Sequence, residues 1–368
     1  MARIPLRLHL LSALPLLVAG CGDASHGLPK VPERDVRPTP VTSRVLQDGS
    51  FLRSPDRVAV VGSRLVVLDE SSTAHVLRAA DGKHLASVGR KGDGPGEFHS
   101  PNAVEPDPQD PASFWIYDMQ HARSTRFTLA GAEGSAVQSS GTLQLQTNVL
   151  VFQPVWINGS MLVASGLFED GRLALFTRGG LKIRPVGQLL LDDARQVPAQ
   201  VWQHAHMGRL TASLQRGRIA MATRHADELA FYSDKGDLIQ RVRGSHGYEP
   251  RYEVRRLKGV PYMTSGDDLR FGYIDLASTD HHVYALFSGR TREEAPGRAN
   301  YAHYVQVFDW DGRLVRTFEL DASVISIAVD RSGEQLFAIR HHPSPALLRI
   351  GIGGPGASQT VRRVAIQH

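Results

Sequence analysis

The segment Leu65-Val66-Val67-Leu68-Asp69 decides the fold, because five later segments repeat its run of apolar residues. These are residues 114–118, 161–164, 219–222, 283–287 and 336–339, and successive starts from residue 65 onward are 49, 47, 58, 64 and 53 positions apart. Repeats of about 40 to 50 residues, each with several short strands, are typical of β-propeller blades. A continuous apolar strand is expected where a blade is buried on both faces. We therefore predict an all-β fold, a six-bladed β-propeller.

Turn sequences support the same repeat. Residues 81–82, 233–236 and 311–312 read Asp-Gly, Ser-Asp-Lys-Gly and Asp-Gly, and each separates two short apolar segments. Asp and Gly tolerate the positive φ angles of tight hairpins, so each turn is predicted to join the third and fourth strands of a blade. Strand-like residues 41–46 and 361–366 are expected to meet in one blade and to close the ring.

The amino terminus has the features of an export signal. Basic Arg3 and Arg7 precede the apolar residues 8–18, a stretch too short to span a bilayer permanently. Residues 17–21, Leu-Val-Ala-Gly-Cys, follow it and resemble the lipobox of bacterial lipoprotein precursors. In that family the cysteine is linked to diacylglycerol before cleavage, so the resemblance implies lipid attachment at Cys21. Because the chain has 1 cysteine, an internal disulfide is excluded.

We expect three segments: a signal peptide over residues 1–20, a lipidated cysteine with a flexible tether over 21–40, and the propeller over 41–368. Four prolines and no apolar periodicity mark residues 22–40 as the tether. Gly22 directly follows the cysteine, whereas retention in the inner membrane typically requires Asp at this position. The sequence therefore favours attachment to the outer membrane, on its periplasmic side. The net charge of +5 falls to +3 without Arg3 and Arg7, too little to indicate nucleic acid.

Two family resemblances cover most of residues 50–350. Residues 89–98 followed by Pro101, and then residues 116–118 and 126–127, resemble the blade-joining signature of NHL-type propellers. In that signature a phenylalanine, here Phe98, packs between blades and the proline starts the next inner strand. Residues 283–290, 307–312, 320–321 and 327–330 resemble the TolB-like six-bladed propeller lipoproteins of bacteria. These resemblances imply the fold and export, but no reaction, because propellers have many unrelated functions.

The chain contains no G-x-S-x-G, P-loop or H-E-x-x-H motif. We therefore expect a non-catalytic binding or scaffold module without a cofactor. The alternative is a hydrolase or lyase of the gluconolactonase-like type, which has Ca²⁺ or another divalent cation on the ring axis. Asp56, Asn102 and Asp275 lie at or near the predicted starts of inner strands and would supply its ligands. Equally, Asp56 and Asn102 could simply cap turns after Pro55 and Pro101.

Two predicted inter-blade loops are long, residues 89–100 and 244–272, and long loops are often functional. The second contains a basic group with one aromatic residue, namely Arg251, Tyr252, Arg255, Arg256 and Lys258. The i, i+4, i+7 spacing of Arg251, Arg255 and Lys258 predicts a short helix with its charges on one side. We expect this group to border the main binding surface of a monomeric domain, facing an envelope protein or glycan. A solvated helix face is the alternative.

Overall fold

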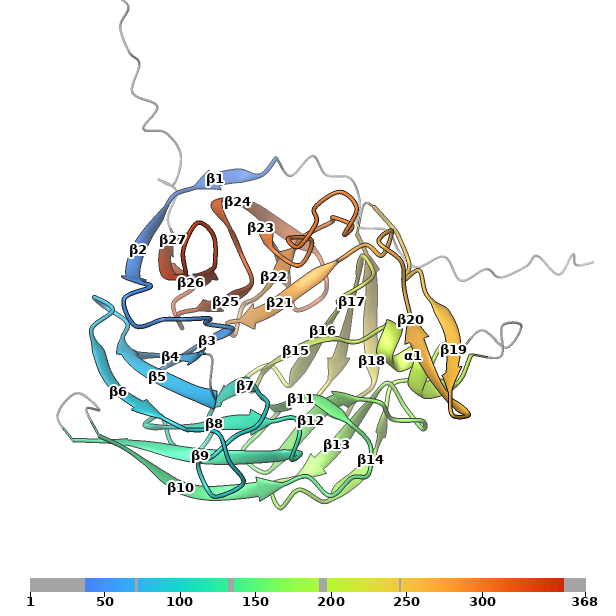
Figure 1. Ribbon diagram of the computed structural model, residues 1–368, viewed down its shortest axis with the longest axis horizontal. Helices are drawn as coiled ribbons and strands as arrows, with labels where there is room; N and C mark the ends of the chain where they lie inside the picture. Colours follow the sequence, from blue (N-terminus) through green and yellow to red (C-terminus); the bar gives the residue numbers. More distant parts are fainter. Residues whose placement is uncertain (1–36, 70–71, 132–135, 192–196, 245, 354–368) are drawn as a thin grey trace, which may run out of the picture.

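The computed structural model describes residues 37–69, 72–131, 136–191, 197–244 and 246–353, and these form a six-bladed β-propeller (Figure 1). The first blade consists of β3 (Arg57–Val61), β4 (Arg64–Asp69), β5 (Thr73–Arg78) and β6 (His84–Val88). The second consists of β7 (Pro101–Pro106), β8 (Ser113–Asp118), β9 (Arg123–Ala130) and β10 (Ala136–Gln144). The third consists of β11 (Val151–Trp156), β12 (Met161–Gly166), β13 (Leu173–Thr177) and β14 (Lys182–Val186).

The remaining blades follow in chain order around the ring. The fourth consists of β15 (Gly208–Ser213), β16 (Arg218–Thr223), β17 (Glu228–Ser233) and β18 (Leu238–Arg243). The fifth consists of β21 (Tyr273–Ser278), β22 (His282–Phe287), β23 (Ala302–Asp309) and β24 (Leu314–Val324). The sixth contains β25 (Ser326–Val329), β26 (Gln335–Arg340) and β27 (Ala346–Gly351). All six predicted apolar segments are second strands, and the three predicted turns join third to fourth strands, as expected.

The amino-terminal strands close the ring. β2 (Ser43–Asp48) pairs antiparallel with β27, with Ser43 opposite Ile350, and so becomes the outer strand of the sixth blade. The prediction that residues 41–46 help to close the ring is confirmed, whereas residues 361–366 lie outside the described residues. β1 (Thr39–Val41) pairs parallel with β24 and adds a fifth strand to the fifth blade. Both pairings cover an outer sheet edge that would otherwise be unpaired.

The hydrophobic core lies between the blades. Each cluster of buried side chains among the described residues is shared by two adjoining blades. Between the first and second blades, Phe98 packs near Phe127, and Phe127 stacks on Phe114 with ring centres 5.5 Å apart. The side chains of Leu65 to Leu68 are at most 2% exposed, because both faces of a second strand contact neighbouring blades. This two-sided burial explains the continuous apolar runs.

Two further elements lie between blades. α1 (Ala199–Ala205) precedes the fourth blade, and β19 (Glu253–Leu257) pairs with β20 (Val260–Thr264) before the fifth. β20 lies against α1 at the side of the ring (Figure 1). In the part of the chain that the structure describes, no helix has the length and apolar character needed to cross a membrane.

Candidate functional site

The long connections gather at one end of the propeller. Because successive strands of a blade are antiparallel, the turns from second to third strands and the connections to the next blade emerge at the same end. Residues 89–100, 244–272 and 288–301 are such connections, as is the segment that contains α1. We call this the loop-bearing end. Ligands of propellers are expected where loops from several blades converge.

The six inner strands β3, β7, β11, β15, β21 and β25 surround the axis of the ring (Figure 1). Residues of all six strands line a cavity of about 260 Å³ on this axis. Its polar lining consists of Arg57, Asn102, Glu105, Gln153, Arg209 and Asp275, with Thr211 and Ser278. Arg57, Asn102, Arg209 and Asp275 lie within the first three residues of their strands, which start at the loop-bearing end. We call these four residues the mouth of the cavity. Polar side chains from four blades, three of them charged, therefore meet at one opening.

Asp275 links two inner strands at the mouth. Its carboxylate accepts hydrogen bonds from the Ser326 hydroxyl at 2.6 Å and from the Ile327 backbone N–H at 3.0 Å. Arg209 lies beside it, with Nε 3.9 Å from Oδ1. Burial raises the pKa of Asp275, while the positive charge of Arg57 and the bond from Ser326 act in the opposite direction. The carboxylate is therefore already used to hold the fifth and sixth blades together.

Arginine side chains dominate the mouth. Arg57 and Arg209 are only 14% and 11% exposed, and Arg57 Nε is buried without an acceptor in the described residues. Arg224, in the turn after β16, interacts electrostatically with Arg57 and Asp275, and its burial lowers the pKa of its guanidinium to about 10. That guanidinium lies 5.5 Å from the centre of the Phe271 ring. Within the described part of the chain, no hydrogen bond from this guanidinium is found.

A second carboxylate lies further along the axis. Glu105 on β7 lines the cavity and is half-buried. Burial raises the pKa of Glu105 to about 8; a hydrogen bond with Gln153 opposes the rise, and the negative charge of Asp275 adds to it. Glu105 is therefore largely protonated at neutral pH. Gln153 also bridges blades, because its amide exchanges hydrogen bonds with the backbone of Leu210 on β15.

The three residues expected to bind an axial cation lie at or beside the mouth. Asp56 is half exposed, with its carboxylate 3.3 Å from Arg57, and the Asn102 amide nitrogen contacts the Met119 sulfur at 3.6 Å. Asp275 is occupied by Ser326 and Ile327, as described above. Two arginines beside this carboxylate oppose a divalent cation electrostatically. The residues present therefore fit an anion at this place better than Ca²⁺.

The predicted helix in residues 251–258 is wrong. This segment forms the β19–β20 hairpin, whose two-residue turn is Lys258-Gly259 with φ of 48° and 82°. Positive φ at both central positions is the geometry that a tight hairpin requires. Pro261 would also interrupt a helix, whereas it is accepted in the second strand of an exposed pair. The charge spacing is compatible with a helix and with a strand pair, whereas the Lys258-Gly259 turn is compatible only with the strand pair.

The hairpin changes how the basic group is displayed. Arg255 and Arg256 are adjacent on a strand and so point to opposite faces. Arg255 pairs with Glu253 at 3.1 Å, and Arg251, before the strand, lies 3.4 Å from Asp268. Exposed apolar side chains interleave with these charges, namely Val254, Leu257, Val260 and Tyr262. The five predicted residues therefore belong to one protruding hairpin and its approach, with the Tyr252 ring near His206.

Sequence reasoning missed the arginines of the axis. Arg57, Arg209 and Arg224 come from three connections or strand starts that are far apart in the chain. Their positions in the blades are similar. Arg57 and Arg209 lie at the first and second residues of inner strands, and Arg224 directly follows a second strand. Once the blade register is assigned, that position identifies residues that face the loop-bearing end of the axis.

A family model described as TolB-like 6-blade propeller-like matches residues 37–332. The β-propeller domain of Cps50 (Swd1) from Myceliophteria thermophila is 12% identical and aligns over 84% of this chain and 100% of its own, with a TM-score of 0.48. U3-55K is 13% identical over 84% and 98%, with a TM-score of 0.48, and the RRP9 WD40 repeats are 13% identical over 84% and 96%, with 0.47. These likenesses are too distant to bear on activity. No curated protein matches significantly.

Proposed function

Because this chain belongs to the TolB-like six-bladed propeller family, we propose that it is a cell-envelope lipoprotein whose propeller is a non-catalytic binding module. Its ligand is a molecule or group with a carboxylate or phosphate that enters the mouth of the axial cavity. Cys21 carries the lipid, and the propeller faces the periplasm from the outer membrane. The family supports the fold, and the lipobox-like residues 17–21 support the anchor.

One observation carries the ligand class. Arg224 is half-buried, and within the described residues its guanidinium donates no hydrogen bond, while the Nε of Arg57 is buried and also lacks an acceptor there. Buried donors are normally satisfied, and guanidinium groups match carboxylate and phosphate oxygens in pairs. With Glu105 protonated, the charges lining the cavity are Arg57 and Arg209 against Asp275. An anion would supply the missing acceptors and balance the excess positive charge.

The β19–β20 hairpin lies at the same loop-bearing end and supports a second contact. Its basic side chains, with exposed Leu257 and Val260 at the turn, suit an acidic surface of an envelope protein or glycan. An anionic group of such a partner would then enter the axial cavity. We propose a monomeric propeller for this role and no nucleic-acid partner.

Isothermal titration calorimetry with citrate and with inorganic phosphate tests the ligand class. We expect the wild type to bind at least one of these anions. Arg57→Gln combined with Arg224→Gln should weaken binding by more than about tenfold, since each charge-assisted hydrogen bond is worth roughly 1.5–3 kcal/mol. Arg251→Gln with Arg255→Gln, on the exposed hairpin and its approach, is the matched control and should bind normally. Equal affinity in all three proteins would contradict the assignment to the axis.

Lipidation is tested separately. Replacement of Cys21 by Ser should abolish incorporation of labelled palmitate and leave an unprocessed precursor. Labelling that persists in the variant would contradict the anchor while leaving the proposal for the axial site intact.

A further inference from the structure

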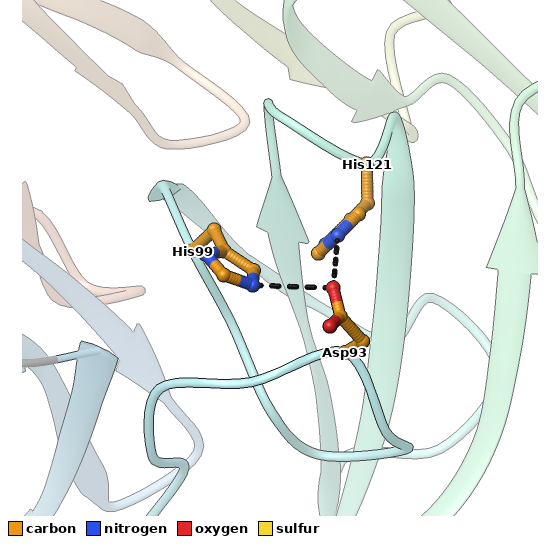
Figure 2. A group of neighbouring side chains, drawn as sticks. All are labelled: Asp93, His99 and His121. Atoms are coloured by element: carbon orange, nitrogen blue, oxygen red, sulfur yellow. Dashed lines mark hydrogen bonds and ion pairs between the residues drawn. The ribbon is translucent and has the colours of Figure 1, made fainter.

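Three side chains meet at the loop-bearing end, outside the axial cavity. Asp93 and His99 lie in the connection before β7, and His121 lies in the turn between β8 and β9 (Figure 2). Asp93 Oδ1 is 3.1 Å from His99 Nε2 and 3.0 Å from His121 Nε2. In the described ranges of the chain, no other group of three or more His, Cys, Asp or Glu residues converges in this way.

His121 lies between two carboxylates. Its Nδ1 is 2.9 Å from Asp118 Oδ2, while its Nε2 faces Asp93. A neutral imidazole carries one N–H, so it can donate to only one of them. If Nδ1–H donates to Asp118, a lone pair on Nε2 points at a carboxylate oxygen at hydrogen-bond distance. A cation bound by both atoms would relieve that repulsion.

Asp118 is held in place by contacts that do not involve His121. It ends the second strand β8, has no exposed surface, and accepts the backbone N–H groups of His99 and Ser100 at 2.8 and 3.1 Å. Asp69 ends the second strand of the first blade and binds the N–H groups of Arg53 and Ser54 in the same manner. Each of these carboxylates also contacts an imidazole, Asp69 that of His75 at 3.3 Å and Asp118 that of His121 at 2.9 Å. Among the described residues, only His121 also belongs to a group of three possible metal ligands. A carboxylate bonded to the far nitrogen of a histidine is the usual support of a metal-binding ring.

The loop that carries Asp93 is also held in place by hydrogen bonds. The guanidinium of Arg123 donates to the backbone oxygens of Asp93 at 2.8 Å, of Gly94 at 3.1 Å and of Glu97 at 3.0 Å. The Glu97 carboxylate in turn accepts the N–H of Gly94 at 2.9 Å. The Asp93 side chain is 84% exposed and those of His99 and His121 about one quarter exposed. The cluster is therefore positioned from inside and open to solvent outside.

The separations match metal coordination. Ligand atoms about 2.1 Å from an ion are about 3.0 Å apart at a right angle and about 3.4 Å apart in a tetrahedron. The two observed separations, 3.0 and 3.1 Å, need little adjustment to reach either arrangement. Two imidazoles and one carboxylate suit divalent transition metals, whereas Ca²⁺ and Mg²⁺ prefer oxygen ligands throughout.

We propose that Asp93, His99 and His121 bind one divalent transition-metal ion, with Zn²⁺ as the occupant expected, and that Asp118 orients His121. Solvent completes the coordination. The site is separate from the arginine mouth and from Asp56, Asn102 and Asp275, so it does not depend on the proposed anion-binding function.

The test uses the full-length chain, purified in detergent without a polyhistidine tag and freed of metal with a chelator. Titration with Zn²⁺ should give one ion per chain, and millimolar Ca²⁺ or Mg²⁺ should not compete. Asp93→Asn, an exposed substitution that preserves shape, and His121→Ala should each weaken Zn²⁺ binding by about tenfold or more. Co²⁺ provides a second signal, because its visible absorption band on the wild type should be lost in His121→Ala.

The matched control replaces two exposed histidines elsewhere, His281→Ala with His342→Ala, and should retain wild-type binding. Circular dichroism melts establish that each variant is folded. The proposal is overturned if the wild type binds no stoichiometric Zn²⁺ in the micromolar range. It is equally overturned if the Asp93 and His121 variants bind as the wild type does.

Discussion

Replacement of Glu105 by Gln should change how the stability of the propeller depends on pH. Burial in the axial cavity raises the pKa of Glu105 to about 8, against 4.5 for a carboxyl group in the unfolded chain. The folded protein therefore holds an additional proton between these values. The stability linked to Glu105 is fully present below about pH 4.5 and is lost as pH rises toward 8.

The size of the effect follows from the shift. Each unit of difference in pKa corresponds to about 1.4 kcal/mol, so the difference between 4.5 and about 8 sets a ceiling of roughly 5 kcal/mol. Water that enters the cavity solvates the carboxylate and lowers this figure. We expect the free energy of unfolding of the wild type to fall by about 2 to 4 kcal/mol between pH 5 and pH 8 from this group. Gln cannot ionise, so the free energy of unfolding of Glu105→Gln should not show this decrease.

Urea unfolding followed by tryptophan fluorescence at pH 5, 6.5 and 8 measures the effect. Glu169→Gln, which removes an exposed carboxylate, is the control and should follow the wild type. Burial also raises the pKa of Asp275, so part of the decrease in stability with rising pH should remain in the Glu105 variant. If wild type and Glu105→Gln lose the same stability between pH 5 and pH 8, the carboxyl group is not buried as described.

Two other substitutions test the packing and the hairpin. Leu77→Ala should destabilise the protein by about 2 to 5 kcal/mol in urea unfolding, because Leu77 has no exposed surface between the first and sixth blades; a cost below 1 kcal/mol would contradict that burial. Arg251, Arg255 and Arg256 together changed to Glu should leave the melting temperature nearly unchanged, since exposed substitutions usually cost about 0.5 kcal/mol or less. The same variant should no longer recover an acidic partner from detergent-solubilised envelope, and unchanged recovery would remove the hairpin from the binding surface.

The blades could be predicted from the sequence because their second strands have a physical signature of their own. β8 is buried along its whole length, and the aligned strands in the other blades are nearly so, since neighbours cover both faces. The connections between third and fourth strands could be predicted as well, because Asp and Gly accept the positive φ angles of tight turns. In the hairpin of residues 253–264, the charge spacing led to a wrong prediction, because Arg255 and Lys258 are compatible with both a helix and a strand pair. Gly259 and Pro261 are compatible only with the strand pair.

The sites could not be predicted in this way, because neither depends on neighbouring residues in the chain. Arg209 becomes a neighbour of Asp275 when the fourth and fifth blades pack together, and Arg57 only when the ring closes. His99 and His121 are brought together by the antiparallel pairing of β7 with β8 and by the path of the preceding connection (Figure 2). A blade register derived from sequence would place them at the same end, but the contact itself needs three dimensions.

We propose above that an anion binds to the arginines at the mouth of the axial cavity. The most direct measurement is a crystal soaked in selenate, whose anomalous scattering locates a tetrahedral dianion without reference to its natural source. We expect the strongest anomalous peak at the mouth of the axial cavity, within hydrogen-bond distance of Arg57 and of the nearby Arg224. Selenate found only at exposed arginines such as those of the hairpin, with the mouth of the cavity empty, would contradict it.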